Sequence, residues 1–126
     1  MTRDARQPDG LPTPKAPYSP VVVSGDHVYT AGQVALDANG ELVAGGIEEQ
    51  TRQVFANLRA CLQAADCDFE DVVKVNAYLT DLGNFPSFNA VYEEHFTPPF
   101  PARTTVQAGL APGFLVEIEA VARRPS

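Results

Sequence analysis

Two stretches of the chain carry apolar residues at helical spacing. Across residues 47–65 apolar side chains recur every three or four positions, which predicts an amphipathic helix with one buried face. A second stripe of this kind runs through residues 85–96, with Asn84 placed to cap its start and Pro98-Pro99 following its end. We therefore expect two helices that pack on a common partner.

Short runs of β-branched and aromatic residues predict the strands that form this partner. Residues 21–23 and 27–34 flank a Ser-Gly-Asp turn and indicate a hairpin, and Asn39-Gly40 predicts a second tight turn between two short strands. The later strands are expected at residues 71–80, 102–108 and 115–123. The predicted fold class is α+β, a two-layer sandwich in which a mixed sheet of five to six strands carries both helices on one face.

The sheet face opposite the helices would hold the candidate chemistry. Alternation along residues 115–123 places Glu117 and Glu119 on that face, and we expect Arg103 and Thr105 to share it. A mixed face of this kind is either solvated, where its ion pairs are worth little, or buried between copies of the chain. If it is buried, Arg103 can donate to both oxygens of a ligand carboxylate, and Glu117 can hold a water or move a proton.

Charge narrows the classes of partner. The 126 residues include 9 Lys plus Arg against 16 Asp plus Glu, a formal net charge of -7. Phosphate polyanions and anionic lipid surfaces are repelled on average, so nucleic acid and membrane are not expected partners. No apolar run approaches the roughly 20 residues that span a bilayer, and the N-terminus lacks the apolar core of a secretory signal.

Length and cysteine use complete this description. A chain of this size fits one domain, residues 1–126, and the polar, proline-containing residues 1–16 predict an extended N-terminal arm. Cys61 and Cys67 form neither a disulfide framework nor a CxxC pair, and Cys61 falls on the apolar stripe of the first helix. Two reduced thiols favour a cytoplasmic location.

Ordered segments along nearly the whole chain resemble the RidA family, the reactive intermediate deaminases, also called YjgF or L-PSP endoribonuclease-like proteins. Several matches in the right order are far more specific than any single motif. The matching segments are residues 16–20 (APYSP), 30–33 (TAGQ), 39–41 (NGE), 50–53 (QTRQ), 75–81 (VNAYLTD), 88–92 (FNAVY), 101–103 (PAR) and 116–120 (VEIEA).

The resemblance implies a chorismate-mutase-like fold and a homotrimer whose sheets face inward, with clefts between neighbouring subunits. It also implies an enzyme of the 2-iminobutanoate/2-iminopropanoate deaminase type, a hydrolase for metabolite damage control. Its substrates would be reactive 2-enamine and 2-imine acids such as 2-aminoacrylate, and its products 2-oxo acids and ammonia. No cofactor is implied. The alternatives are a non-catalytic trimer that binds small 2-oxo acids for regulation, or an endoribonuclease, against which the negative charge argues.

By the same resemblance, Arg103 would grip the substrate carboxylate and Glu117 would orient or activate the attacking water. The pattern itself does not separate Glu117 from Glu119. The further substrate-binding residues that the resemblance implies are Tyr18, Gly32, Asn89 and Thr105.

Two features depart from the family pattern. Thr105 stands where many members have Cys or Ser, so a thiolate route is not available at this position. The loop between Arg103 and Glu117 is one residue shorter than in well-studied members.

No metal site is expected, since His27 and His95 share no ligand spacing. Tyr92 fits a role as a packing aromatic.

Overall fold

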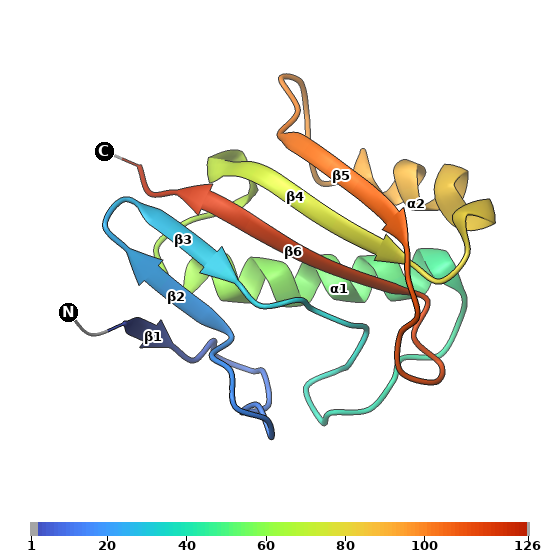
Figure 1. Ribbon diagram of the computed structural model, residues 1–126, viewed down its shortest axis with the longest axis horizontal. Coiled ribbons are helices and arrows are strands. Elements are labelled where there is room, and N and C mark those ends of the chain that lie inside the picture. Colours follow the sequence, from blue (N-terminus) through green and yellow to red (C-terminus); the bar gives the residue numbers. More distant parts are fainter. Residues whose placement is uncertain (1–2, 126) are drawn as a thin grey trace.

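The computed structural model describes residues 3–125 and has a six-stranded mixed sheet with two helices packed behind it (Figure 1). The strand order is β1-β2-β3-β6-β4-β5. Neighbouring strands are antiparallel except β4 and β5, which are parallel. The elements are β1 (Asp4–Arg6), β2 (Val21–Ser24), β3 (His27–Thr30), α1 (Ile47–Gln63), β4 (Val72–Leu79), α2 (Phe85–Tyr92), β5 (Ala102–Gln107) and β6 (Val116–Arg123), with short 3-10 turns at Phe69–Asp71 and Leu82–Asn84. The predicted α+β class is confirmed.

The core lies between the sheet and α1, where the expected apolar rows meet. In β6, Val116, Ile118 and Ala122 are fully buried, and they alternate with the partly exposed carboxylates. Cys61 lies in the opposing stripe of α1, and its burial raises the pKa of the thiol to about 12. A thiol with that pKa stays protonated at neutral pH, so Cys61 is a core residue, as its position in the stripe predicts.

The N-terminal segment begins with a strand that the sequence does not predict. β1 adds to the sheet by pairing antiparallel with β2, with Ala5 opposite Val22. Arg6 anchors it, since its guanidinium donates to the Ala64 carbonyl at 3.1 Å, beyond the end of α1. The first part of the N-terminal segment therefore lies against the body of the protein.

The segment around Asn39-Gly40 is a loop rather than a hairpin of two strands. Its turn is present, with Gly40 at φ 77°, but only one isolated bridge, Leu36 to Leu42, joins the two sides. The strand predicted over residues 27–34 is β3, and it ends at Thr30, four residues earlier than predicted. Backbone carbonyls in this loop bond to a side chain of α1 instead of to a neighbouring strand, as described below.

α2 is shorter than its apolar stripe. The helix ends at Tyr92 and continues as turns that still bury Phe96. The apolar spacing predicts which face is buried, and it does not fix where the helix stops. None of the helices within residues 3–125 has the length and hydropathy needed to cross a bilayer.

Candidate functional site

Arg103 lies on the helix side of the sheet. In the register of β4 and β5 it pairs with Val75, which is buried beneath the helices, and Thr105 follows two residues later on the same face. Glu117 pairs with Tyr78 in the register of β4 and β6, on the opposite face. The prediction that Arg103, Thr105 and Glu117 share the uncovered face is therefore wrong.

The reason is that β5 is an edge strand with two rows of similar polarity. Because Arg103 and Thr105 were expected on the outer face, alternation would turn the row of Val106 towards the helices, yet Val106 is 41% exposed on the outer face. Thr104 lies in this outer row too, and its hydroxyl accepts a hydrogen bond from Lys74 Nζ at 2.9 Å. Alternation fixes which residues share a row, but it does not fix which row is buried when neither is clearly apolar.

Arg103 packs over an aromatic shelf, which we define as Phe85, Phe88 and Tyr92 of α2. The guanidinium carbon lies 4.6 Å from the Tyr92 ring centre, and 5.4 Å and 5.5 Å from those of Phe85 and Phe88. Contacts of this kind contribute about 0.5–2 kcal/mol each and use no N–H donor. Among residues 3–125 no carboxylate lies within 4.0 Å of Arg103, so its donors are free for a ligand.

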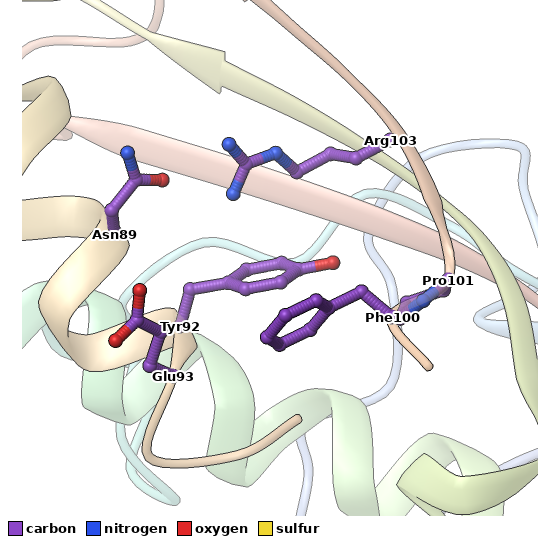
Figure 2. A pocket seen from close by; sticks show the side chains of 6 residues that line it. All are labelled: Asn89, Tyr92, Glu93, Phe100, Pro101 and Arg103. Carbon is purple, nitrogen blue, oxygen red and sulfur yellow. The ribbon is translucent and has the colours of Figure 1, made fainter. Parts of the chain in front are cut away.

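A pocket of about 410 Å³ opens beside this guanidinium (Figure 2). It is lined by Asn89, Tyr92, Glu93, Phe100, Pro101 and Arg103. Asn89 Oδ1 and the Tyr92 hydroxyl are buried, and so is the Thr105 hydroxyl on the same sheet face; none finds a hydrogen-bond partner in the described part of the chain. Buried polar atoms without partners are costly, so we read them as groups that a ligand or water satisfies.

Tyr92 is the site residue that sequence reasoning missed. It was given a packing role because it falls in the apolar stripe of α2, and its ring does pack there. Burial raises the pKa of its hydroxyl, and the positive charge of Arg103 acts in the opposite direction. The spacing held a usable signal, since Asn89 and Tyr92 are three residues apart and share one helix face.

On the other face of the sheet, the predicted residue Gly32 lies against Glu117. A Cβ at Gly32 would collide with the Glu117 carboxylate, so the missing side chain at Gly32 makes room for Glu117. Gly32 also lines a separate pocket of about 380 Å³ beneath the N-terminal segment, together with Tyr18. Tyr18 is 56% exposed, and so its ring is open to a partner.

The structure separates the two carboxylates of β6. Glu119 accepts a hydrogen bond from the Tyr78 hydroxyl at 2.9 Å, and this bond raises the pKa of Tyr78. Burial raises the pKa of Glu117, and the negative charge of Glu119 adds to the shift. A carboxylate with a raised pKa is a stronger base in its ionised form, so Glu117 is the better candidate for proton transfer.

Two buried amides of α1 hold the loops that flank Glu117. Asn57 Nδ2 donates to the carbonyls of Val34 and Leu36 at 3.0 and 2.9 Å, which fixes the loop that follows Gly32. Gln50 Nε2 donates to the Gly113 carbonyl and its Oε1 accepts from the Leu115 amide, both at 2.9 Å. α1 therefore determines the backbone on both sides of the carboxylate.

The predicted site residues, together with Tyr92, thus form two groups. The arginine group on the helix side is Asn89, Tyr92, Arg103 and Thr105, and it can bind a carboxylate. The glutamate group is Glu117 on the outer face, Gly32 beside it and Tyr18, which shares a pocket with Gly32, and its carboxylate can hold a water and move a proton. Within residues 3–125, no cluster of His, Cys, Asp and Glu is arranged to hold a metal ion.

Known proteins resemble the chain over nearly its full length. The family model described as Endoribonuclease L-PSP matches residues 10–124. A RutC family protein of Pyrococcus horikoshii is 42% identical over 116 residues, which are 90% of this chain and 92% of that protein. The 2-iminobutanoate/2-iminopropanoate deaminase of Homo sapiens is 42% identical over 108 residues, 84% of this chain and 79% of that enzyme.

Solved structures agree with the sequence matches. The crystal structure of RidA from the Antarctic bacterium Psychrobacter sp. PAMC 21119 superposes with a TM-score of 0.90 at 39% identity, covering 96% of this chain and 99% of that one. Because identities of 39–42% extend over most of each chain, the likeness includes the sequence as well as the fold. The chain therefore belongs to the L-PSP endoribonuclease family, the RidA family that its sequence resembles.

Proposed function

We propose that this protein hydrolyses 2-enamine and 2-imine acids to 2-oxo acids and ammonia, at a site that two copies of the chain build together. The observation that carries the proposal is the Arg103 guanidinium, packed on aromatic rings and without a carboxylate partner among residues 3–125. An arginine in this state fits the carboxylate that every such substrate carries. Relatives that are named imine deaminases support the same reaction.

In this proposal the arginine group binds and orients the acid. The planar guanidinium of Arg103 donates to both carboxylate oxygens, and charge-assisted bonds of this kind are worth about 1.5–3 kcal/mol. The buried Oδ1 atom of Asn89 and the hydroxyl of Thr105 can form hydrogen bonds with polar atoms next to the carboxylate. Holding the acid in one pose is a large part of the catalysis, because binding has already met the entropic cost of bringing the reactants together, which the reaction in water must meet at the transition state.

The glutamate group supplies the proton transfers. Water attacks C2 of the protonated imine, and Glu117 takes a proton from this water as the new C–O bond forms. Glu117 then gives this proton to the nitrogen of the carbinolamine. The C2–N bond breaks as the O–H proton of the carbinolamine passes to Glu117, which releases ammonia and leaves the 2-oxo acid. Its raised pKa suits Glu117 to both steps, and acid–base help of this kind typically contributes about 10²- to 10⁴-fold.

Two copies are needed because the groups lie on opposite faces of one sheet. A neighbour that places its glutamate group against the arginine group of the first copy would complete a cleft. The outer face has apolar side chains that such packing would cover, including Tyr29, which is 47% exposed, and Val106. A closed homotrimer with one cleft at each interface meets this requirement.

A coupled assay tests the proposal. A pyridoxal-phosphate lyase generates 2-aminoacrylate, and pyruvate formation is followed with and without this protein. We expect faster pyruvate formation, and its loss in Arg103→Leu and in Glu117→Gln. Assemblies formed from both variants together should recover about one quarter of the activity, since one interface in four pairs an intact Arg103 with an intact Glu117.

Each outcome has a distinct meaning. No acceleration by the wild-type protein contradicts the deaminase function. Acceleration without recovery in mixed assemblies contradicts the shared site only. Tight binding of 2-oxobutanoate through Arg103 without turnover would favour a regulatory trimer that binds small 2-oxo acids. An RNA-cleaving role is disfavoured by the net charge of -7, and a salt-dependent RNA-binding measurement checks it.

A further inference from the structure

We propose that Glu93 makes the Arg103 pocket selective for acids with a single negative charge. The 2-iminobutanoate and 2-iminopropanoate in the names of this protein's relatives carry one carboxylate and a short apolar side chain, and Glu93 would be the residue that excludes acids with a second carboxylate. This inference rests on the proposed function, since it concerns the same pocket, and it adds the residue that sets the charge selectivity.

The position of Glu93 is not explained by the stability of α2. It occupies the C-cap of the helix, where the helix dipole disfavours negative charge. The next residue, Glu94, is held by Arg52 at 2.8 Å, whereas no cation lies within 4.0 Å of Glu93 among residues 3–125. Glu93 is therefore an exposed carboxylate at an unfavourable helix end, with no cation beside it in the described part of the chain, and it lines the pocket.

The charges around the pocket determine what it accepts. Of the six lining residues only Arg103 and Glu93 are charged, and they are too far apart to form an ion pair. Figure 2 shows Glu93 projecting from α2 beside Tyr92, across the pocket from the Arg103 side chain. The first carboxylate of a ligand neutralises Arg103. A second carboxylate in the same pocket would meet Glu93, and none of these six residues offers it another cation.

The remaining walls suit an uncharged side chain. Tyr92, Phe100 and Pro101 present ring and aliphatic surface to the pocket, and Phe100 is 50% exposed. A short apolar side chain can bury part of this surface and gain about 25 cal/mol for each Å² removed from water. A second carboxylate in its place would lose hydration without gaining a cation.

Calorimetry with stable 2-oxo acid products tests the inference without turnover. The probes are 2-oxobutanoate, with one carboxylate, and 2-oxoglutarate, with two. We expect the wild-type protein to prefer 2-oxobutanoate, and Glu93→Gln to narrow the affinity ratio by about three- to tenfold at low salt and less at high salt. Glu94→Gln is the matched control, because it removes the same charge one residue away, outside the lining of this pocket. It should leave the ratio unchanged.

Glu93→Lys reverses the charge at this position. Glu93→Lys should move the preference towards 2-oxoglutarate, since it supplies a second cation. A ratio that stays fixed in Glu93→Gln, or that changes equally in Glu94→Gln, overturns the inference while leaving the proposed function intact. A wild-type preference for 2-oxoglutarate also overturns the inference and leaves the proposed function intact. If neither acid binds through Arg103, the proposed function fails and the inference falls with it.

Discussion

Replacing Asn57 by Leu should test how α1 holds the glutamate group in place. Asn57 is 4% exposed, and its amide makes three hydrogen bonds: two to loop carbonyls at 3.0 and 2.9 Å, and one from Gln53 Nε2 at 3.0 Å. Leucine has a similar volume, so the main loss is polar. The Leu36 carbonyl loses its partner, whereas the Val34 carbonyl keeps the hydrogen bond from the Leu36 amide at 2.8 Å, so the free energy of unfolding should fall by about 1–3 kcal/mol.

Urea unfolding followed by circular dichroism measures this loss, with Gln53→Met as the control. That variant removes only the bond from Gln53 to Asn57 and should lower stability by less than about 1 kcal/mol. Amide exchange gives a second measurement, because the Val43 amide, which donates to the Ala35 carbonyl, should exchange faster in Asn57→Leu. The reasoning is refuted if Asn57→Leu is no less stable than Gln53→Met, or if exchange in this loop is unchanged.

Three further predictions concern the site. Glu119→Gln removes the like charge beside Glu117 and so lowers the pKa of Glu117. The acid limb of the pH–rate profile should therefore move to lower pH. An acid limb that stays in place argues against Glu117 as the base. Gly32→Ala places a methyl group where the Glu117 carboxylate lies, and should reduce the rate by about 10- to 100-fold in a chain that still folds; unchanged kinetics would show that this contact is dispensable. The Glu93→Gln variant should unfold at the same urea concentration as the wild type or a slightly higher one, because it loses a charge that the helix end disfavours. The Glu94→Gln variant should gain no stability, since it loses an ion pair with Arg52. Greater destabilisation by Glu93→Gln than by Glu94→Gln would count against this account.

The sequence was sufficient to predict the elements whose burial is one-sided. The apolar stripe of α1 and the alternating row of β6 identify their buried faces correctly, because each has one apolar side and one polar side. β1 was missed because Asp4–Arg6 pairs with β2 through its backbone, and its side chains carry no strand pattern. The loop around Asn39 has the turn signal of a hairpin, but a side chain of α1 takes the carbonyls that a strand would need.

The candidate site shows the same limit more sharply. The resemblance selected Arg103 and Glu117, but the pattern in β5 placed them on one face because neither row of that strand is distinctly apolar. Cation–π packing on α2 decides where Arg103 lies, and such a contact between segments distant in sequence leaves no periodic signal. Tyr92 was hidden for a related reason, since its ring serves the core while its hydroxyl faces the ligand pocket.

The three-residue strand at the N-terminus has a consequence for solubility. Without β1 the sheet would end on Val21–Ser24, three consecutive valines with an open row of backbone donors and acceptors, which is a template for strand addition between molecules. β1 replaces this edge with a short one that carries Asp4 and Arg6, and charged short edges resist further pairing. Trimming the first residues should therefore leave a protein that folds yet slowly forms fibrillar aggregates.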